Sequence, residues 1–552
     1  MKKACLMMMA LAFLTLTAPT AAWGDEAGLW QELQKLFAGD GAAFDDLGWS
    51  VALDGDAALV GARGADVNGN FRQGAAYVFT RTGGLWAQQA KLVAGDGAAF
   101  DGFGISVALD GDTALVGAAN AAVNGVRQGA AYVFTRTGEG WVQQGKLVAG
   151  DGAASDAFGL SVTLDGGTAL VGAYNAAVNG NRFQGVAYVF TRAGEGWVQR
   201  AKLVAGDGAA FDRFGGSVAL HGDTALVGAG YAAVNGNSGQ GAAYVFSRTS
   251  DGWAQQAKLV AGDGAASDGF GISVALDGDT ALVGALGADV NGNGPQGAAY
   301  VFIRTGGDWV QQAKLVAGDS AVFDDFGTSV ALDGDTALVG AWGAAVNGNF
   351  QQGAAYVFSR TGEGWAQQAK LVAGDGAADD VFGWSVALDG DTGLMGAPGA
   401  DVDGNRWQGA AYVFTLPTTE RPALACLGAD VGLFMPPLDV EVIVRGPNRV
   451  LPLRMQLFDA AGLEVTGADL DSAPVLEVVF LGENSGGAGI PDELDYSGQG
   501  DAGNRFSYGE DYWQFNLGTG SFSAPGLYGI TVEAGDDSHT IDPGCTASFV
   551  IR

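Results

Sequence analysis

The chain has 552 residues, more than one domain normally holds, with 93 glycines, a hydrophobic fraction of 48% and only 16% charged residues. Its formal net charge of −33 argues against a nucleic-acid partner, because such binding depends on Lys and Arg side chains that neutralise phosphates. Short runs of Val, Ala, Leu, Tyr and Phe between glycine turns indicate an all-β protein.

The N-terminal segment has the order of a secretory signal. Lys2 and Lys3 precede an apolar run, and small residues follow it up to Ala22. This order predicts a signal peptide over residues 1–22 and an exported protein, secreted or periplasmic. Later segments fall short of the roughly 20 apolar residues of a membrane helix, so no membrane insertion is expected.

One stretch of sequence is repeated seven times along the chain. Its copies are marked by tryptophans 55 or 56 residues apart, at Trp30, Trp86, Trp141, Trp197, Trp253, Trp309 and Trp365. A fixed period of this size indicates a repeat architecture. The second copy contains four β-like runs, at 106–109, 114–117, 130–136 and 141–148, separated by glycine-containing turns. Four antiparallel strands repeated seven times predict a seven-bladed β-propeller.

The two ends of the repeated part complement each other. The seventh copy stops after its third strand, at 410–414, and an unmatched fourth strand, 30–37, precedes the first copy. Pairing these two segments would complete the last blade, and a closed ring leaves no long unpaired sheet edge. We therefore predict a propeller over residues 29–417 that is closed by the N-terminal strand.

Two short motifs carry a family resemblance. Phe-Gly occurs at 103–104, 158–159, 214–215, 270–271, 326–327 and 382–383, with Leu47-Gly48 in the first copy. Gly-Ala follows thirteen residues later in every copy. This pattern resembles the FG-GAP repeat of integrin α-subunit propellers, and most closely the bacterial form that contains Ala-Tyr-Val-Phe. The resemblance implies a β-propeller that serves in extracellular binding or adhesion.

The two ends of each blade differ in variability. The short hairpins are nearly the same in all copies, whereas the long loops at the other end vary, as a scaffold that presents a binding surface would. Aromatic and arginine side chains gather in blades six, seven and one, and exposed groups of this kind anchor recognition surfaces. The predicted ligand-binding residues are Trp49, Arg63, Phe71, Arg72, Trp342, Phe350, Trp384, Arg406 and Trp407. Neutral drift at water-facing positions would explain the same variability.

Calcium is the one cofactor that the pattern suggests. The resemblance implies calcium sites between the first two strands of a blade, but here that turn is only Asp-Gly-Asp-Thr, too short to wrap the ion. Oxygen-bearing residues alternate in three long loops, at Asp66, Asn68 and Asn70, at Asp289, Asn291 and Asn293, and at Asp401, Asp403 and Asn405. Asn-Gly turn chemistry explains the same residues without a metal.

A ring of aspartates precedes the blades, at Asp40, Asp96, Asp151, Asp207, Asp263, Asp319 and Asp375. Such a ring would concentrate cations, or it would simply belong to Ala-Gly-Asp-Gly turns. A second set includes Asp45, Asp101 and Asp324.

The composition of the chain argues against catalysis. It has two histidines, His221 and His539, and no local Ser-His-Asp, Cys-His or zinc-ligand pattern. The sequence therefore predicts a non-catalytic, monomeric binding or adhesion protein whose partner is an extracellular protein or glycan. The alternative is a self-associating envelope scaffold, and a calcium-dependent adhesin and a glycan-acting enzyme are less favoured.

After residue 417 the repeat ends. Alternating segments at 440–444, 453–457, 512–517 and 528–532 predict a small Ig-like β-sandwich over residues 418–552. The stretches 451–462 and 524–528 resemble the bacterial PxKF domain. Cys426 and Cys545 are expected to form a disulfide in an exported protein, the alternative being two buried free thiols.

Overall fold

The computed structural model describes residues 30–416 apart from single positions in the tight turns (83, 139, 195, 251, 293 and 363), and the backbone of strands between 423 and 551. One compact unit spans Leu29–Leu416, and the chain from Pro417 onward belongs to a second unit. In the described part of the chain, no helix is long and apolar enough to cross a membrane.

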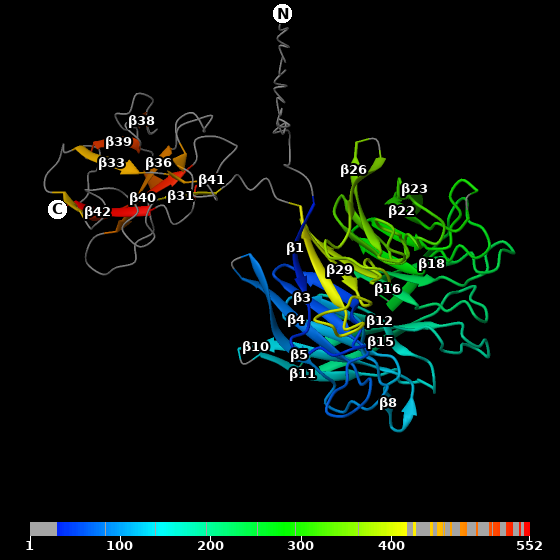
Figure 1. Cartoon of the computed structure of the whole chain (residues 1–552). Helices are drawn as coiled ribbons and strands as arrows, with labels where there is room; N and C mark the ends of the chain where they lie inside the picture. Colours follow the sequence, from blue (N-terminus) through cyan, green and yellow to red (C-terminus); the bar gives the residue numbers. More distant parts are fainter. Residues whose placement is uncertain are drawn as a thin grey trace, which may run out of the picture. The chain divides into compact units, whose positions relative to one another are not determined.

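The first unit consists of seven four-stranded antiparallel sheets, the blades of a β-propeller (Figure 1). Blade 1 contains β2 (Leu47–Asp54), β3 (Ala57–Ala62), β4 (Ala75–Thr82) and β5 (Leu85–Leu92). Blade 2 contains β6 (Phe103–Asp110), β7 (Thr113–Ala118), β10 (Ala130–Thr137) and β11 (Gly140–Leu147), with a small hairpin of β8 (Ala122–Val123) and β9 (Val126–Arg127) in its long loop. Blade 3 contains β12 (Phe158–Asp165), β13 (Thr168–Ala173), β14 (Val186–Ala193) and β15 (Gly196–Leu203).

The remaining blades repeat this order. Blade 4 contains β16 (Ser217–His221), β17 (Thr224–Ala229), β18 (Ala242–Thr249) and β19 (Gly252–Leu259). Blade 5 contains β20 (Ser273–Asp277), β21 (Thr280–Ala285), β22 (Ala298–Thr305) and β23 (Asp308–Leu315). Blade 6 contains β24 (Val330–Asp333), β25 (Thr336–Ala341), β26 (Ala354–Thr361) and β27 (Gly364–Leu371). Blade 7 contains β28 (Ser385–Asp389), β29 (Thr392–Ala397), β30 (Ala410–Thr415) and, as its fourth strand, β1 (Gln31–Leu36).

The ring is closed by the two ends of the repeated part, as the sequence predicts. β1 pairs antiparallel with β30, and the register runs from Gln31 opposite Thr415 to Leu36 opposite Ala411. Two side chains of β1 also reach the loop before blade 7, about 340 residues away along the chain. Lys35 Nζ lies 2.7 Å from the carboxylate of Asp375, and Glu32 accepts a 2.7 Å hydrogen bond from the backbone N–H of Gly374.

The first strand of each blade lines a central channel of about 250 Å³. Each contributes a Val-Ala-Leu triplet such as Val51-Ala52-Leu53, with Thr163 replacing the alanine in blade 3. The apolar core lies between neighbouring blades. Leu59 and Val78 of blade 1 pack with Val116 and Tyr132 of blade 2 in one buried cluster. Both faces of the inner strands are therefore buried, which explains their continuous apolar runs.

The two glycine motifs mark the closest contacts between blades. The glycine that follows each phenylalanine has a positive φ, as in Gly104 at 89°. The glycine of each Gly-Ala pair lies against the backbone of the next blade, so a Cβ on Gly117 would overlap the carbonyl oxygen of Gly159. Ser106 adds a 2.8 Å hydrogen bond to that same oxygen. The motif therefore records backbone packing between blades rather than a ligand site.

One glycine of the repeat has no such role. A Cβ on Gly145 in β11 would meet no atom within 4 Å, and five copies carry alanine at this position. Replacing Gly145 by Ala is expected to raise the free energy of unfolding by about 0.5–1 kcal/mol, because glycine loses more backbone freedom on folding. Urea denaturation of the two chains measures this difference, and a loss of stability would contradict the packing described.

A belt of hydrogen bonds links the short hairpins at the far end of the channel. The aspartate that ends the first strand of one blade accepts a hydrogen bond from the turn glycine of the next blade, as Asp54 does from Gly111 and Asp389 from Gly55. The equivalent position in blade 4 is His221, whose Nδ1 lies 3.3 Å from Asp277. The shortened Asp-Gly-Asp-Thr turns therefore connect blades.

The described strands of the second unit form three sheets. The five-stranded sheet has the order β32 (Val442–Val444), β42 (Thr546–Ile551), β40 (Gly526–Glu533), β36 (Val475–Gly482), β37 (Glu493–Leu494). A four-stranded sheet has the order β35 (Glu464–Val465), β34 (Leu457–Phe458), β31 (Ala423–Cys426), β41 (Thr540–Ile541). The third sheet pairs β33 (Val450–Met455), β39 (Tyr512–Gly518) and β38 (Ser507–Gly509). The Ig-like assignment stays a prediction, and the signal peptide and the disulfide lie outside the described residues.

Candidate functional site

The candidate site lies at the mouth of the channel on the long-loop face. Trp49 belongs to the start of β2 and Trp384 directly precedes β28, while Arg63 and Trp342 directly follow β3 and β25. These positions sit at the loop ends of the two innermost strands of blades 1, 6 and 7. Since the ring brings blades 6, 7 and 1 side by side, Trp49 and Trp384 meet here although they are 335 residues apart in the sequence (384 − 49).

Four of the predicted ligand-binding residues form a continuous row. The ring centroids of Trp342 and Trp384 are 5.6 Å apart, and those of Trp384 and Trp49 are 4.5 Å apart. The guanidinium carbon of Arg63 lies 3.0 Å from the centroid of the Trp49 ring. All four side chains are half-buried, so each keeps part of its surface in contact with solvent. We call Trp342, Trp384, Trp49 and Arg63 the tryptophan row.

A buried carboxylate fixes the end of the row. Asp46, which is 8% exposed, pairs with Arg63 at 3.3 Å between Oδ2 and Nε. Burial raises the pKa of Asp46, while the charges of Arg63 and Arg72 act in the opposite direction. Burial also lowers the pKa of the Arg63 guanidinium, although Asp46 counteracts this. The row therefore ends in a guanidinium held both by a ring face and by an ion pair.

The remaining predicted residues lie in the outer loops of the same face. Trp407 meets Phe44 with ring centroids 5.9 Å apart, and Arg406 lies 5.1 Å from the Trp407 ring. Phe71 and Phe100 form a similar pair at 5.3 Å, with Arg72 5.8 Å from the Phe71 ring. Phe350 is 65% exposed and has no ring contact among the described residues. The structure thus brings the inner four together and leaves these five in outer groups, of which Arg72 also lines a pocket with Arg63.

Sequence reasoning missed the second members of these pairs. Phe44 and Phe100 come from the loops that enter blades 1 and 2, and each contacts an aromatic in the long loop of the preceding blade. Phe211 contacts Phe183 in the same manner, at 5.5 Å. The sequence does contain a signal for these pairs. In each of these copies a Phe directly precedes the second aspartate, and the long loop of the preceding blade contains an aromatic residue.

A second cluster occupies the other side of the ring. Arg213 lies 5.0 Å from the ring of Tyr174, 5.1 Å from that of Tyr231 and 5.8 Å from that of Phe183. These residues were not predicted from the sequence, because glycines occupy the neighbouring variable positions of blade 4, at Gly216, Gly230 and Gly239. They provide an internal control for the role of an arginine stacked on aromatic rings.

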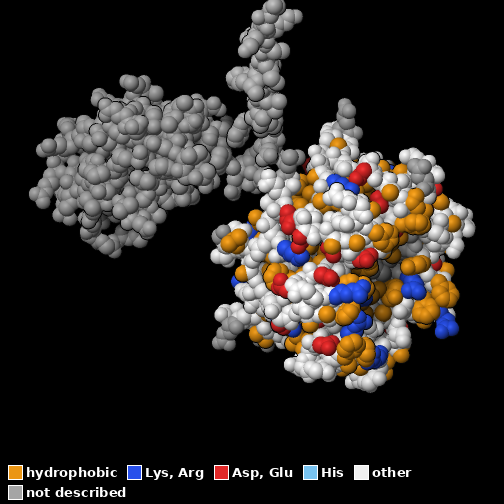
Figure 2. All heavy atoms as spheres, viewed as in Figure 1, with side chains coloured by type: hydrophobic (Ala, Val, Ile, Leu, Met, Phe, Trp, Pro, Cys, Tyr) orange, Lys and Arg blue, Asp and Glu red, His pale blue; other side chains and the backbone are white. Residues whose placement is uncertain are grey.

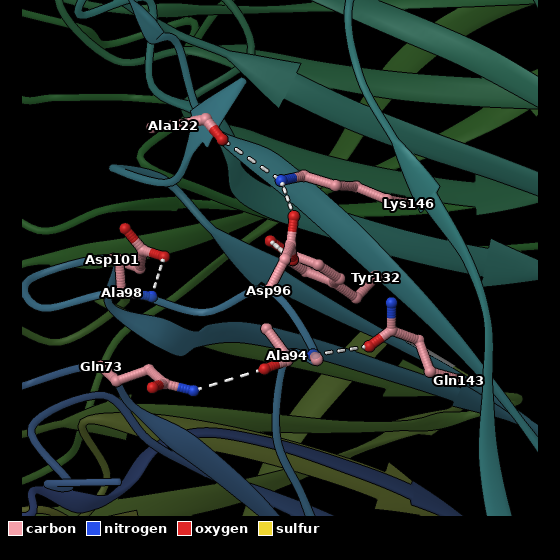
Figure 3. Close-up of polar contacts among 10 residues, drawn as sticks. Gln73, Ala94, Asp96, Ala98, Asp101, Ala122, Tyr132, Gln143 and Lys146 are labelled. Carbon is pink, nitrogen blue, oxygen red and sulfur yellow. Dashed lines mark hydrogen bonds and ion pairs between the residues drawn. The ribbon is translucent and has the colours of Figure 1, made fainter. Parts of the chain in front are cut away.

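The ring of aspartates is part of the framework. Asp96 accepts hydrogen bonds from Lys146 at 2.8 Å and from Tyr132 at 2.9 Å (Figure 3). Burial pushes the pKa of Asp96 up, but these two hydrogen bonds outweigh it and hold the pKa below its usual value. All seven aspartates pair with a lysine in this way. Their charges are therefore balanced by lysines, and the predicted attraction for cations loses its basis.

The second set of aspartates closes the loops. Asp101 accepts a 2.8 Å hydrogen bond from the backbone N–H of Ala98 (Figure 3). Burial raises the pKa of Asp101, and it raises that of Asp45 to about 6 despite the bond from Ala42. These carboxylates stabilise turns, as the alternative interpretation of the sequence states.

Two of the three predicted calcium loops, those of blades 1 and 7, are tight hairpins. Asn68 and Gly69 both have positive φ, and the backbones of Val67 and Asn70 bond across them, which is the geometry of an Asn-Gly turn. In blade 7, Asp403 is equivalent to Asn68 and also has a positive φ, and Asn405 is equivalent to Asn70. In blade 5, Asn291 is equivalent to Asn68 and has a positive φ, while Asn293 lies outside the described residues. Among the described residues, no three His, Cys, Asp or Glu side chains converge on one point. Calcium binding stays a prediction.

The aspartates of these loops hold the outer groups in place. Asp66 accepts a 2.8 Å hydrogen bond from the backbone N–H of Arg72, and Asp401 accepts one of 2.9 Å from Trp407. Arg72 and Trp407 have φ values of 50° and 54°, and Phe183 and Gln351 hold the same conformation in loops that begin with alanine. The aspartate hydrogen bonds therefore add to a geometry that the hairpin already imposes. Asp289 bonds Gly294 in the same way in blade 5. The alternating residues therefore position side chains of the loop face.

Figure 2 shows how the charges are distributed on one face of the propeller. Lys and Arg side chains lie beside Asp and Glu side chains and beside hydrophobic ones. This mixed distribution agrees with the lysine–aspartate ion pairs and the arginine–aromatic contacts described above.

Several solved structures are distantly similar to this chain. PorZ, a surface component of the type-IX secretion system of Porphyromonas gingivalis, is 10% identical with a TM-score of 0.40, over 94% of this chain and 61% of that one, so the chain spans less than two thirds of its length. A PL25 ulvan lyase is 11% identical with a TM-score of 0.41, over 71% and 96%. A GH74 xyloglucanase from Xanthomonas campestris is 13% identical with a TM-score of 0.37, over 78% and 59%. No curated protein matches the chain.

The family of the chain, in contrast, is shown by its repeats. The FG-GAP repeat matches seven segments, which together cover more than half of the chain, at 30–79, 86–134, 141–190, 197–246, 253–302, 309–358 and 365–414. Each segment begins in the outermost strand of one blade and ends in the third strand of the next, in agreement with the observed ring. The chain therefore belongs to the FG-GAP repeat family.

Proposed function

We propose that this protein is an exported, non-catalytic binding or adhesion protein whose propeller presents a ligand surface on its long-loop face. The tryptophan row supports this proposal most directly, because three indole rings and a guanidinium from three neighbouring blades lie in contact there. Large, rigid aromatic side chains and arginine dominate binding energies at recognition surfaces. The channel lining, by contrast, is nearly the same in every blade, so it offers little to distinguish one ligand from another.

Replacing Trp384 by Ala tests the proposal at the centre of the row. Trp384 contacts both other tryptophans, so its removal is expected to weaken ligand binding by about 30-fold or more, as for a hot-spot residue. Binding is measured on an array of extracellular glycans and proteins, and then by titration with the retained ligand. The matched control is Trp141→Ala, a half-buried tryptophan at the start of β11 by the short hairpins, whose indole N–H bonds Gln89. Equal losses in both variants would contradict a ligand surface at the row.

Two further measurements distinguish a binding protein from an enzyme and from a self-associating scaffold. After prolonged incubation with a retained polysaccharide, the length distribution of the polymer is expected to stay unchanged. Sedimentation of the protein alone is expected to show a monomer. Shortened polymer would assign the protein to the enzymes, and concentration-dependent association through the long-loop face would favour a scaffold.

A further inference from the structure

We propose that the ligand is an acidic glycan, whose carboxylate occupies a pocket next to the tryptophan row. This inference rests on the proposed function and specifies its ligand. The pocket has a volume of about 190 Å³ and lies between blades 1 and 2 on the long-loop face. The side chains that line it are Asp46, Arg63, Arg72, Phe100, Ile105 and Asn120.

The pocket and the row share one residue. Arg63 covers the Trp49 ring on one side and lines the pocket on the other. Ile105 occupies the same repeat position in blade 2 as Trp49 in blade 1, so the pocket continues the arc of the row around the channel mouth. A chain molecule lying along the row would therefore bring its next unit into the pocket.

The charges in the pocket favour an anion. Among the side chains that line the pocket, Arg63 and Arg72 each carry a guanidinium group and Asp46 carries the one carboxylate, so the lining has an excess positive charge although the net charge of the protein is −33. Asp66, which accepts the backbone hydrogen bond of Arg72, lies outside this lining. Arg72 is exposed and forms no ion pair within the described residues, so its donors are available to a ligand. The net charge does not prevent this, because at physiological salt charges more than about 8 Å away are largely screened.

The mixture of groups fits a uronic acid better than an acidic peptide. A uronate ring carries a carboxylate for the arginines and hydroxyl groups for the polar atoms of Asp46 and Asn120. Its C–H faces pack on indole rings, whose electron-rich faces attract the weakly positive hydrogens. An aspartate or glutamate side chain offers only the carboxylate. The volume of the pocket accommodates a carboxylate and part of one ring, not a folded segment.

The test uses the full-length protein and calorimetric titration with oligomers of polygalacturonate, alginate and hyaluronan. Each has a carboxyl-reduced counterpart as its neutral control, and poly-glutamate serves as the acidic peptide. We expect at least one uronate oligomer to bind about tenfold or more tightly than its reduced counterpart. Arg72→Gln is expected to abolish this preference without unfolding the protein, since the side chain is exposed. Arg213→Gln, which removes an arginine stacked on Tyr174 and Tyr231, is expected to retain it.

The possible outcomes distinguish this inference from the proposed function. Equal binding of acidic and reduced oligomers, or tighter binding of poly-glutamate, would overturn the acidic-glycan assignment and leave a ligand surface at the row intact. Binding of none of the uronate oligomers would overturn it as well. An acid preference that survives both Arg72→Gln and Trp384→Ala would place the ligand elsewhere and contradict both proposals.

Discussion

A chain that lacks residues 30–37 is expected to lose the closed ring and to unfold at a markedly lower denaturant concentration than the full chain. Deletion of β1 removes the partner of β30, the ion pair of Lys35 with Asp375 and the buried side chain of Leu36. Truncation of a buried leucine alone costs about 2–5 kcal/mol, so loss of the whole strand is expected to exceed about 4 kcal/mol. Urea denaturation followed by tryptophan fluorescence measures it, and limited proteolysis should cleave blade 7 first.

Two leucines of the same strand provide the control for this deletion. Leu36 is 2% exposed, whereas Leu33 is 41% exposed at a bulge in the pairing. Leu36→Asp is expected to reproduce most of the loss, and Leu33→Asp to change stability by less than about 0.5 kcal/mol. A synthetic peptide with the sequence of residues 30–37 should restore protease resistance to the shortened chain. Unchanged stability after the deletion would show that β1 does not close the ring.

Gly117→Ala is expected to lower the free energy of unfolding by about 3 kcal/mol. The added methyl group would overlap the carbonyl oxygen of Gly159, which belongs to the backbone of the next blade and is also held by Ser106. Neither strand can move without opening the contact between blades, so this is overpacking at a rigid site. Thermal and urea denaturation measure the loss.

Gly145→Ala in the same blade is the matched control, because the identical chemical change there meets open space. The two substitutions are therefore expected to have opposite signs. If Gly117→Ala were as stable as the parent chain, the glycine of the Gly-Ala motif would need an explanation other than contact between blades.

The repeat made most of the fold predictable from sequence. The period gave the number of blades, and the orphan strand near Trp30 correctly predicted the pairing with Tyr412 through β1 and β30. Strand direction also placed Trp49 and Trp384 on one face, and their rings are in contact. These conclusions depend only on backbone topology, which hydrophobic alternation and turn residues determine.

The chemistry of the loop face was much less predictable. That Arg63 stacks on Trp49 and pairs with Asp46 depends on side-chain directions that no sequence spacing determines. The aspartates of the ring look the same in sequence whether they attract cations or pair with lysines, and the deciding partner, such as Lys146 for Asp96, lies 50 residues away. The pocket beside the row combines residues of blades 1 and 2, so it exists only once these two blades have packed together.

The seam of the ring has an evolutionary consequence. Because each sequence repeat starts with the last strand of one blade and ends with the third strand of the next, gain or loss of one whole copy leaves both chain ends unchanged. A gene in which one repeat is duplicated would still encode two compatible chain ends. The enlarged propeller would need only a small change in the angle between neighbouring blades. The surface around the paired chain ends would be preserved when a repeat is gained, while its distance from the blades on the opposite side of the ring would grow.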